Sequence, residues 1–292
     1  MKLIEPNVEL WDYENPIDHV ARCARVCYKS DKSDNNEALL ERLKASSHNS
    51  MFRHETHYYI VPIVKNPNLN LELLYKFIKD FNKSPYFNNF YTSMNIYIST
   101  NGNFVLDNKD IFDDYFEKFK VDKNVFFTFD CNKPIRRFTF YITTQISTSR
   151  ELNRTSPNNI AEESTRYCNY SKDKFGKEIK ICKPHWYDNA NSIIQNIFND
   201  ACIHAESAYF KLLDEGFLPQ DARGVLPIDA ATSVVYTYTV DEWKHIIDLR
   251  YRGITGKPHP NAKIIIGMVF DKFKEMGYIT DDEDPENDTT CS

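Results

Sequence analysis

The sequence lacks several features that would assign it to a familiar class at once. Its seven cysteines form no CxxC pair, no apolar run is long enough to cross a membrane, and there is no Gly-rich phosphate loop. An odd number of irregularly spaced cysteines favours reduced thiols in a cytoplasmic protein over a disulfide framework. The net charge of −6 argues against binding to a nucleic-acid polymer, although a few local arginines suffice to hold a small anion.

The ends of the chain also lack targeting features. The first residues, MKLIEPNVELWDYENP, contain acids and proline but no apolar core of a signal peptide, so neither secretion nor a membrane partner is expected. The last residues, DDEDPENDTTCS, predict an acidic disordered tail over 281–292. With 41% hydrophobic residues, the rest of the 292-residue chain predicts a single globular domain over 1–280, with an elaboration at about 66–130.

Hydrophobic periodicity predicts an α+β fold, with helices flanking a central mixed or antiparallel sheet. Helical spacing is present in NPIDHVARCARVCYKS, EALLERLKASS, 69–80, NSIIQNIFNDACIHAESAYFKLLDEG, DEWKHIIDLRYR and NAKIIIGMVFDKFKEMG. Strands are predicted for HYYIVPIV, RRFTFYITTQIS and TSVVYTYTV, with a buried helix as the alternative for the last. Gly216 predicts the end of the longest helix, and NGN at 101–103 predicts a hairpin turn.

Two short motifs suggest chemistry that their context disfavours. HETH, from His54 to His57, is one residue shorter than the HExxH signature of zinc proteases, and on a strand its two rings point to opposite faces. We therefore expect no metal site there. Cys168 lies inside a polar cluster, where a neighbouring cation such as Arg166 would favour a nucleophilic thiolate, but a buried structural cysteine is the commoner case.

The polar cluster runs from Arg150 to Gly176, RELNRTSPNNIAEESTRYCNYSKDKFG. Its arginines stay charged at neutral pH, so they must hold an anion or offset the nearby carboxylates. Ser164 and Arg166 alternate as on an extended turn, which suits recognition of a phosphate by a hydroxyl and a guanidinium. A solvated polar face is the alternative that composition alone leaves open.

ESTRYCNYSKDKFG, after SRELNR, resembles the signature region of the flavin-dependent thymidylate synthases, whose pattern is RHRxxSxNExSxRY. The resemblance spans most of the chain, because further similar segments follow the family's order. These segments are ARVCYKS (24–30), HNSMFRH (48–54), YTSMNIYIS (91–99), EGFLPQDARGVLPIDAAT (215–232) and WKHIIDLR (243–250).

The resemblance implies a fold, a reaction and an assembly. Members of the family bind dUMP, transfer a methylene group from methylenetetrahydrofolate and reduce it with hydride from FADH2, which NADPH regenerates. They use no cysteine nucleophile, and they are homotetramers whose active sites are shared between subunits. We therefore expect FAD, NADPH and 5,10-methylenetetrahydrofolate as partners of this chain.

The resemblance also implies two sets of site residues. The dUMP set is Glu151, Arg154, Glu162, Ser164, Thr165, Arg166, Arg223 and Arg250. Within it, Arg250, Glu151 and Ser164 are expected to be catalytic. The FAD and folate set is His48, Ser50, Arg154, Thr155, Ser156, Asn159, Thr239 and His245.

The sequence departs from the family in the flavin set. RHR reads Arg154-Thr155-Ser156, the serine of the motif is Asn159, and a later asparagine is Thr239. Charged hydrogen bonds are worth roughly 1.5–3 kcal/mol each, so these losses weaken flavin binding unless Arg150 or Lys172 compensates. Three hypotheses follow: a flavin-dependent thymidylate synthase, a hydroxymethylase that omits the reduction and uses water, and a non-catalytic nucleotide-binding protein.

Overall fold

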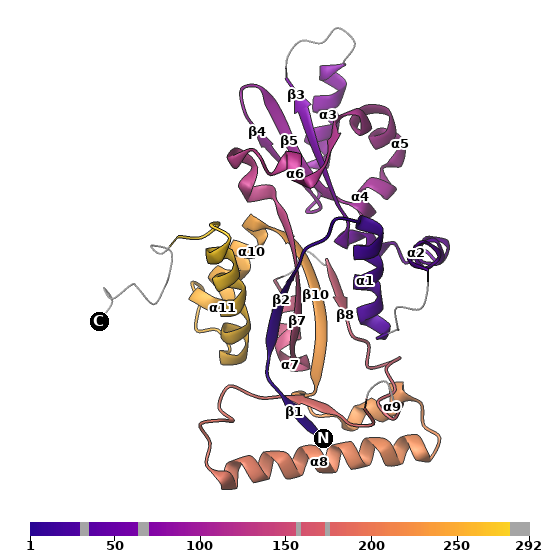
Figure 1. Ribbon diagram of the computed structural model, residues 1–292, viewed down its shortest axis with the longest axis vertical. Helices are drawn as coiled ribbons and strands as arrows, with labels where there is room; N and C mark the ends of the chain where they lie inside the picture. The colour runs from indigo at the N-terminus through magenta and orange to yellow at the C-terminus, as the bar shows by residue number, and fades with distance from the viewer. Residues whose placement is uncertain (30–34, 64–69, 156–158, 173–175, 281–292) are drawn as a thin grey trace, which may run out of the picture.

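The computed structural model describes residues 1–29, 35–63, 70–155, 159–172 and 176–280, so Ser156 and the expected tail lie outside the described residues. Three β-sheets and the surrounding helices form an α+β fold, as the sequence predicts. Along the long axis, a second sheet lies at one end, the main sheet in the middle and the long helix α8 at the other end (Figure 1).

The main sheet contains four antiparallel strands in the order β2-β7-β10-β8. Its strands are β2 (Asn7–Trp11), β7 (Arg137–Gln145), β10 (Ala231–Thr239) and β8 (Ile160–Glu162). β7 and β10 pair along their whole length, from Arg137 opposite Thr239 to Gln145 opposite Ala231. The β-branched and aromatic residues of TSVVYTYTV therefore form a central strand, and the alternative of a buried helix is wrong.

Helices cover both faces of the main sheet (Figure 1). These are α10 (Val240–Ile247) and α11 (Pro260–Glu275) on one face and α1 (Pro16–Tyr28) on the other. Because side chains alternate along a strand, Tyr236 packs with Trp243 in the core beneath α10, whereas its neighbour Val235 packs with Cys23 of α1. Both faces of β10 are therefore buried, and the face toward α1 also carries the polar side chains of Ser233 and Thr237.

The second sheet has the order β4-β5-β3-β6 and its own aromatic core. Its elements are β3 (Thr56–Pro62), α3 (Leu71–Phe81), β4 (Phe87–Tyr91), β5 (Asn95–Asn101) and β6 (Lys120–Val121). The rings of Phe81 and Phe112 stack with centroids 5.7 Å apart. The second sheet begins with β3 at Thr56, before the predicted start of the elaboration at about residue 66. The division into domains stays a prediction.

The predicted hairpin turn at NGN is wrong. Asn101 ends β5, and Gly102 begins helix α4 (Gly102–Asp107). The β4–β5 turn lies earlier, where the Thr92 amide donates to the Asn95 carbonyl at 2.9 Å. The side chain of Asn101 accepts a hydrogen bond from the Phe104 amide at 2.9 Å, so this asparagine is a helix cap, which favours the same residue type as a turn.

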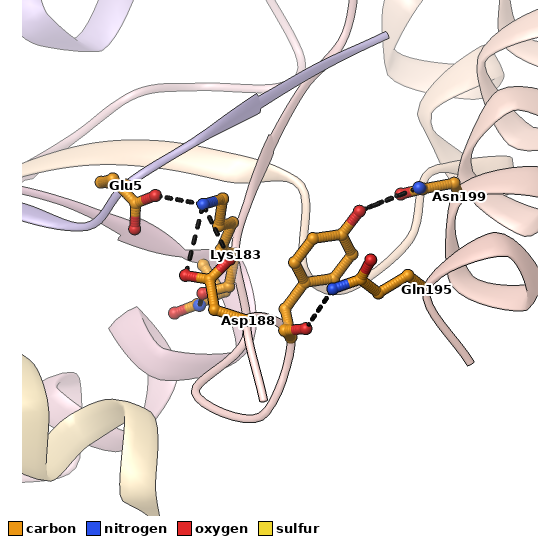
Figure 2. A network of polar contacts seen from close by, with 7 residues as sticks. Glu5, Lys183, Asp188, Gln195 and Asn199 are labelled. Carbon is orange, nitrogen blue, oxygen red and sulfur yellow. Dashed lines mark hydrogen bonds and ion pairs between the residues drawn. The ribbon is translucent and has the colours of Figure 1, made fainter. Parts of the chain in front are cut away.

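Helix α8 (Ser192–Asp214) lies next to a short parallel sheet of β1 (Lys2–Ile4) and β9 (Lys180–Cys182). Its end is as predicted, because Gly216 follows with a φ of +90°, a conformation that favours glycine. Figure 2 shows how the segment before the helix is held. Lys183 Nζ contacts Glu5 at 2.5 Å, and Gln195 Nε2 of α8 donates to the Tyr187 carbonyl at 2.9 Å.

The apolar residues of α8 are not all buried. Tyr209 is fully buried, but Ile193, Ile194 and Ile197 are 69%, 46% and 66% exposed, and Ile203 is 48% exposed. Helical spacing therefore predicts the helix correctly. It does not show that other residues of the same chain bury the apolar face of this helix. Contiguous exposed apolar residues are typical of an interaction surface.

Short helices complete the described part of the chain. They are α2 (Asn36–Ala45), η1 (Asn49–His54), α5 (Lys109–Ile111), η2 (Phe112–Phe116), η3 (Glu117–Phe119), α6 (Lys123–Phe126), η4 (Asp130–Ile135), α7 (Ile146–Asn153), α9 (Pro219–Ala222), η6 (Arg223–Val225) and η7 (Asp248–Arg252). No helix among the described residues is both long and apolar enough to span a membrane.

A buried chain of hydrogen bonds joins η1, the main sheet and α1. The ring of His54 contacts the Thr237 hydroxyl at 2.8 Å, Thr237 contacts Thr139 at 2.7 Å, and Thr139 contacts the ring of His19 at 3.2 Å. His57, the other histidine of HETH, instead pairs with Glu55 at 3.0 Å. Within the described ranges, no three His, Cys, Asp or Glu side chains are grouped as a metal site.

Acid is expected to destabilise the protein through the buried residues His19 and His54. Burial lowers the pKa of His19 from 6.5 to about 4 and that of His54 to about 3. Both rings are neutral in the folded protein, so below pH 6.5 the unfolded chain binds protons that the folded chain does not. The free energy of unfolding then falls by up to about 1.4 kcal/mol per pH unit for each ring.

Urea unfolding of His54→Gln at several pH values measures this contribution. The variant should show a shallower loss of stability between pH 6.5 and 4 than the wild type. His204→Gln, which changes an exposed histidine of α8, is the control and should keep the wild-type slope. Identical slopes for all three proteins would contradict the assignment.

Candidate active site

Two residues of the predicted dUMP set, Glu151 and Arg250, come together at the end of the main sheet. Helix α7 follows β7 directly and carries Glu151, whereas the π-helical turn η7 follows α10 and carries Arg250. One carboxylate oxygen of Glu151 lies 3.3 Å from Arg250 Nη1. The other oxygen lies 3.5 Å from Arg154 Nη1. π-Helical turns are rare and are often found at functional sites.

Packing fixes the position of Arg250. Its neighbour Tyr251 packs on Phe270 of α11, with ring centroids 5.0 Å apart, and a Cβ on Gly267 would lie 3.1 Å from the Tyr251 ring. Gly253 ends η7 with a φ of +73°. The Arg250 side chain is 19% exposed, and its buried Nε has no hydrogen-bond partner among the described residues. The guanidinium is thus held in place with donor capacity left over.

Glu162 is used inside the protein. Its carboxylate accepts hydrogen bonds from the Ser149 hydroxyl at 2.7 Å, the Thr232 hydroxyl at 3.1 Å and the Asn153 amide at 3.3 Å. These contacts tie α7 to β8 and β10. The predicted contact of Glu162 with dUMP stays a prediction, and the observed geometry makes this residue the one that positions the helix of Glu151.

A second group of residues from the predicted dUMP set is built around the turn after β8. The Ser164 amide donates to the Cys27 carbonyl at 3.0 Å, which attaches the turn to the end of α1, and the Arg166 amide lies 3.3 Å from the Ser164 hydroxyl. Arg223 Nη1 donates to the Thr165 hydroxyl at 3.0 Å. The fold thereby brings together four residues of the predicted dUMP set, although Ser164 and Arg223 are 59 positions apart in the sequence.

Gln220 of α9 joins the two arginines and was missed by the sequence analysis. Its side-chain oxygen accepts from Arg166 Nε at 3.0 Å, and its carbonyl accepts from Arg223 Nε at 3.1 Å. The only signal was its place three residues before Arg223. Both guanidinium groups are exposed, so this pair is open to an anion from solvent.

The two groups do not contact each other directly. Among the described residues, no hydrogen bond or ion pair links Glu151 or Arg250 with Arg166 or Arg223. In Figure 1, α9 lies beside α8 at one end of the molecule, α7 lies at the adjoining end of the main sheet, and α10 and α11 flank that sheet. The joint role of the two groups in binding a nucleotide stays a prediction.

The predicted flavin set lies on several elements. His48 and Ser50 are exposed on and beside η1, and His245 is exposed on α10. Thr239 is buried and caps α10, because its hydroxyl accepts from the Glu242 amide at 3.2 Å. Their role in FAD and folate binding stays a prediction.

Two residues of the flavin set lie between α7 and β8. The Thr155 hydroxyl donates to the Leu152 carbonyl at 2.8 Å, which ends α7. The side chain of Asn159 is fully buried, and neither of its amide atoms has a hydrogen-bond partner in the part of the chain that the structure describes.

Cys168 is buried and lies behind the turn. Its thiol is inaccessible to solvent, with the Cys27 carbonyl 4.0 Å from the sulfur. Because a nucleophile must reach its substrate, Cys168→Ser should keep kcat within about twofold of the wild type. A continuous assay of nucleotide conversion measures this, and an inactive but folded variant would restore the thiol as a candidate nucleophile.

Comparison with known proteins gives the following relatives. A family model described as Thymidylate synthase complementing protein matches residues 135–275, and no curated protein matches the chain. Two similar solved structures are crystal structures of PolB, a UMP/dUMP methylase from Streptomyces cacaoi. The complex with 5-Br dUMP is 16% identical, with a TM-score of 0.43 over 94% of this chain and 93% of that chain. The complex with 5-Br UMP is 17% identical, with a TM-score of 0.43 over 94% and 91%.

The segment that matches the family model includes the elements of both arginine groups. It extends from the start of β7 to the end of α11 and contains α7, the turn after β8, α9, η6 and η7. Glu151, Arg166, Arg223 and Arg250 all lie within it. Residues 135–275 of the chain therefore match the family described as Thymidylate synthase complementing protein, which agrees with the resemblance to the flavin-dependent thymidylate synthases.

Proposed function

We propose that the chain is a flavin-dependent thymidylate synthase that converts dUMP to dTMP, with 5,10-methylenetetrahydrofolate as carbon donor and FAD and NADPH as sources of hydride. The observation that carries the proposal is the Glu151–Arg250 pair inside the family region, 99 positions apart in sequence and 3.3 Å apart in the fold. FAD, when bound, supplies the hydride; the residues of this chain bind and orient the nucleotide.

Arg250 has the chemistry to activate a uracil ring. Methylene transfer requires the ring carbon to become nucleophilic, which places negative charge on a ring carbonyl oxygen. A fixed cation stabilises that charge, an effect worth about 3 kcal/mol per donor. Glu151 holds the guanidinium through an ion pair and leaves the buried Nε without a partner among the described residues.

Arg166 and Arg223 have the chemistry to hold the phosphate of the nucleotide. Both guanidinium groups are exposed and already face Gln220 and Thr165. A nucleotide monophosphate carries nearly two negative charges, which two guanidinium groups offset through charge-assisted hydrogen bonds. The proposal assigns them to the anionic end of dUMP and Arg250 to its ring.

Among the described residues of one chain, the two groups make no hydrogen bond or ion pair with each other, which is compatible with a homotetramer that has shared active sites. A site that needs both groups is completed when one subunit supplies Arg166 and Arg223 and another supplies Glu151 and Arg250. The apolar surface of α8 offers an interface for such copies, since Ile193, Ile194 and Ile197 are exposed in one chain.

Ile197→Asp should dissociate this assembly, because burying an unpaired carboxylate in an apolar interface is unfavourable. Light scattering after size-exclusion chromatography should show a smaller species with lost activity. Val125→Asp places the same charge at an exposed apolar residue of α6 and should leave the mass unchanged. A wild-type protein that is monomeric and active would contradict the shared site.

A specific observation favours a second candidate, a hydroxymethylase without the reductive step. Thr155 and Ser156 replace the His and second Arg of the family motif, and Thr239 caps a helix. With fewer flavin contacts, the methylene group would be captured by water instead of hydride. The dUMP groups are retained under either candidate.

Flavin absorbance and NADPH dependence distinguish the candidates. The purified protein is assayed with dUMP and methylenetetrahydrofolate, with and without NADPH, and the product is identified by mass spectrometry. Yellow protein whose dTMP formation requires NADPH supports the proposed synthase. A colourless protein that forms hydroxymethyl product without NADPH supports the second candidate, and dUMP binding without turnover contradicts both.

A further inference from the structure

Glu163 is a buried acidic residue at the start of the turn after β8. It belongs to the signature segment of the sequence but to neither predicted set of site residues. Its side chain is 1% exposed. Its amide donates to the Ser233 carbonyl of β10 at 2.8 Å, which fixes the start of the turn on the main sheet. A buried carboxylate is unfavourable unless other groups offset its charge.

Two side chains contact the Glu163 carboxylate. The Tyr170 hydroxyl donates to one oxygen at 3.0 Å, and Lys29 Nζ lies 2.6 Å from the other. Burial and the negative charge of Glu163 raise the pKa of the Tyr170 hydroxyl, so it stays protonated and can donate. Among the described residues, no hydrogen bond reaches the oxygen that faces Lys29, so this contact depends on opposite charge. We call Lys29, Glu163 and Tyr170 the Glu163 cluster.

Lys29 has a backbone conformation that a lysine rarely adopts. It follows the last residue of α1 and has a φ of +43°, in the left-handed region that favours glycine. A residue with a Cβ keeps this conformation at a cost in free energy, which the surrounding structure must offset. The ion pair with Glu163 is such a contact. A lysine at a position suited to glycine therefore indicates a use for its side chain.

The Glu163 cluster joins the turn to two helices. The lysine of the cluster follows α1, and the tyrosine packs on Tyr209 of α8 with ring centroids 5.8 Å apart. Between the glutamate and the tyrosine, the turn carries Ser164, Thr165 and Arg166 of the predicted dUMP set. Because the cluster fixes both ends of this segment, it limits the positions that the Arg166 guanidinium can reach.

We propose that Glu163 is a positioning residue of the candidate active site, a role that rests on the proposed function. Lys29 and Tyr170 hold its carboxylate, and the carboxylate holds the turn so that Arg166 meets the phosphate of dUMP. Lys29 also offsets a negative charge that would otherwise repel an anion bound at the turn. Both residues act on binding of the nucleotide and not on the chemical step.

Lys29→Gly tests this role with little risk to the fold, because glycine suits a φ of +43°. The variant leaves the buried carboxylate without its cation. The KM for dUMP should rise by about tenfold or more, since a contact between charged groups contributes at least that factor. The kcat should stay within about twofold of the wild type, because the lost contact is equally absent from the ground state and the transition state.

Hydrogen exchange of the same proteins, measured without nucleotide, reports on the turn itself. The amides of Ser164 and Cys168 donate to carbonyls at 3.0 and 2.9 Å, so they are protected while the turn is held. Lys29→Gly should speed up their exchange. Lys29→Gly/Glu163→Gln removes both charges but keeps an acceptor for the Tyr170 hydroxyl. This double variant should recover slow exchange and most of the lost dUMP affinity.

Lys177→Gly is the matched control. Lys177 is an exposed lysine with a φ of +53°, so the same substitution is made in the same backbone conformation but removes no group of the Glu163 cluster. Its KM for dUMP and the exchange of the turn should be those of the wild type. The melting temperature of each variant establishes that it is folded.

A raised KM for dUMP with an unchanged kcat, faster exchange of the turn and recovery in the double variant support the positioning role. Either an unchanged KM or unchanged exchange in Lys29→Gly overturns it. A double variant as impaired as Lys29→Gly also overturns it, because the charge of Glu163 would then have no effect. A wild-type protein that binds no dUMP would contradict the proposed function, and the exchange of the turn, which needs no nucleotide, then decides whether the cluster holds it.

Discussion

Replacing Arg250 by alanine is expected to lower kcat by about 10²- to 10³-fold, the cost of removing one preorganised donor from a developing oxyanion. The loss should be in the chemical step, because the proposed charge on the uracil carbonyl is largest in the transition state. Single-turnover conversion of dUMP, with methylenetetrahydrofolate as donor, measures the step directly. Circular dichroism and the melting temperature establish that the variant is folded.

Arg252→Ala is the matched control for Arg250→Ala. Arg252 lies two residues further along η7, has a side chain that is 20% exposed against 19% for Arg250, and pairs with Asp248 at 2.6 Å. It removes an equally buried cation from the same turn but not from the Glu151 pair. The control should keep the turnover rate within about tenfold. Arg250→Ala with a rate this close to the wild type would remove Arg250 from the reaction.

Replacing Arg166 and Arg223 together by alanine is expected to weaken dUMP binding by at least about a hundredfold. Each charge-assisted hydrogen bond contributes roughly 1.5–3 kcal/mol, and every 1.4 kcal/mol is tenfold in affinity. Equilibrium dialysis with labelled dUMP measures the loss. The single variants should each show a smaller loss, since the remaining guanidinium still contacts the phosphate.

Deoxyuridine, which lacks the phosphate, provides the control ligand. Its affinity should be the same for the double variant and the wild type, because the proposed contacts are with the phosphate alone. Gln220→Leu should weaken dUMP less than either arginine variant, since Gln220 orients the guanidinium groups without carrying charge. If deoxyuridine lost as much affinity as dUMP, the two arginines would not be the phosphate site.

Much of the fold follows from local sequence. Residues that alternate or are β-branched, as in RRFTFYITTQIS and TSVVYTYTV, form the paired central strands of the main sheet. The helices follow from apolar spacing, and Gly216 ends α8 as expected. The hairpin at NGN was wrong because asparagine and glycine serve helix caps as well as turns. Which of the two forms depends on the packing of the next residues.

Some residues of the candidate site could likewise be predicted from the sequence, whereas others could not. The signature segment predicted Arg166 and Glu151 as site residues by residue type and order, and the family model confirms the resemblance over 135–275. Gln220 was missed because an isolated glutamine has no pattern of its own. Glu162 accepts three hydrogen bonds within the protein, a use that its place in a motif does not show.

The sequence by itself determined the α+β class, the central strands, the main helices and the family resemblance, because these depend on residue spacing and on short ordered motifs. Only the tertiary structure decided that Glu151 meets Arg250 and that Arg166 meets Arg223 through Gln220. The physical reason is that ion pairs form between side chains that chain packing brings within a few ångströms. Their separation along the sequence carries no information about that distance.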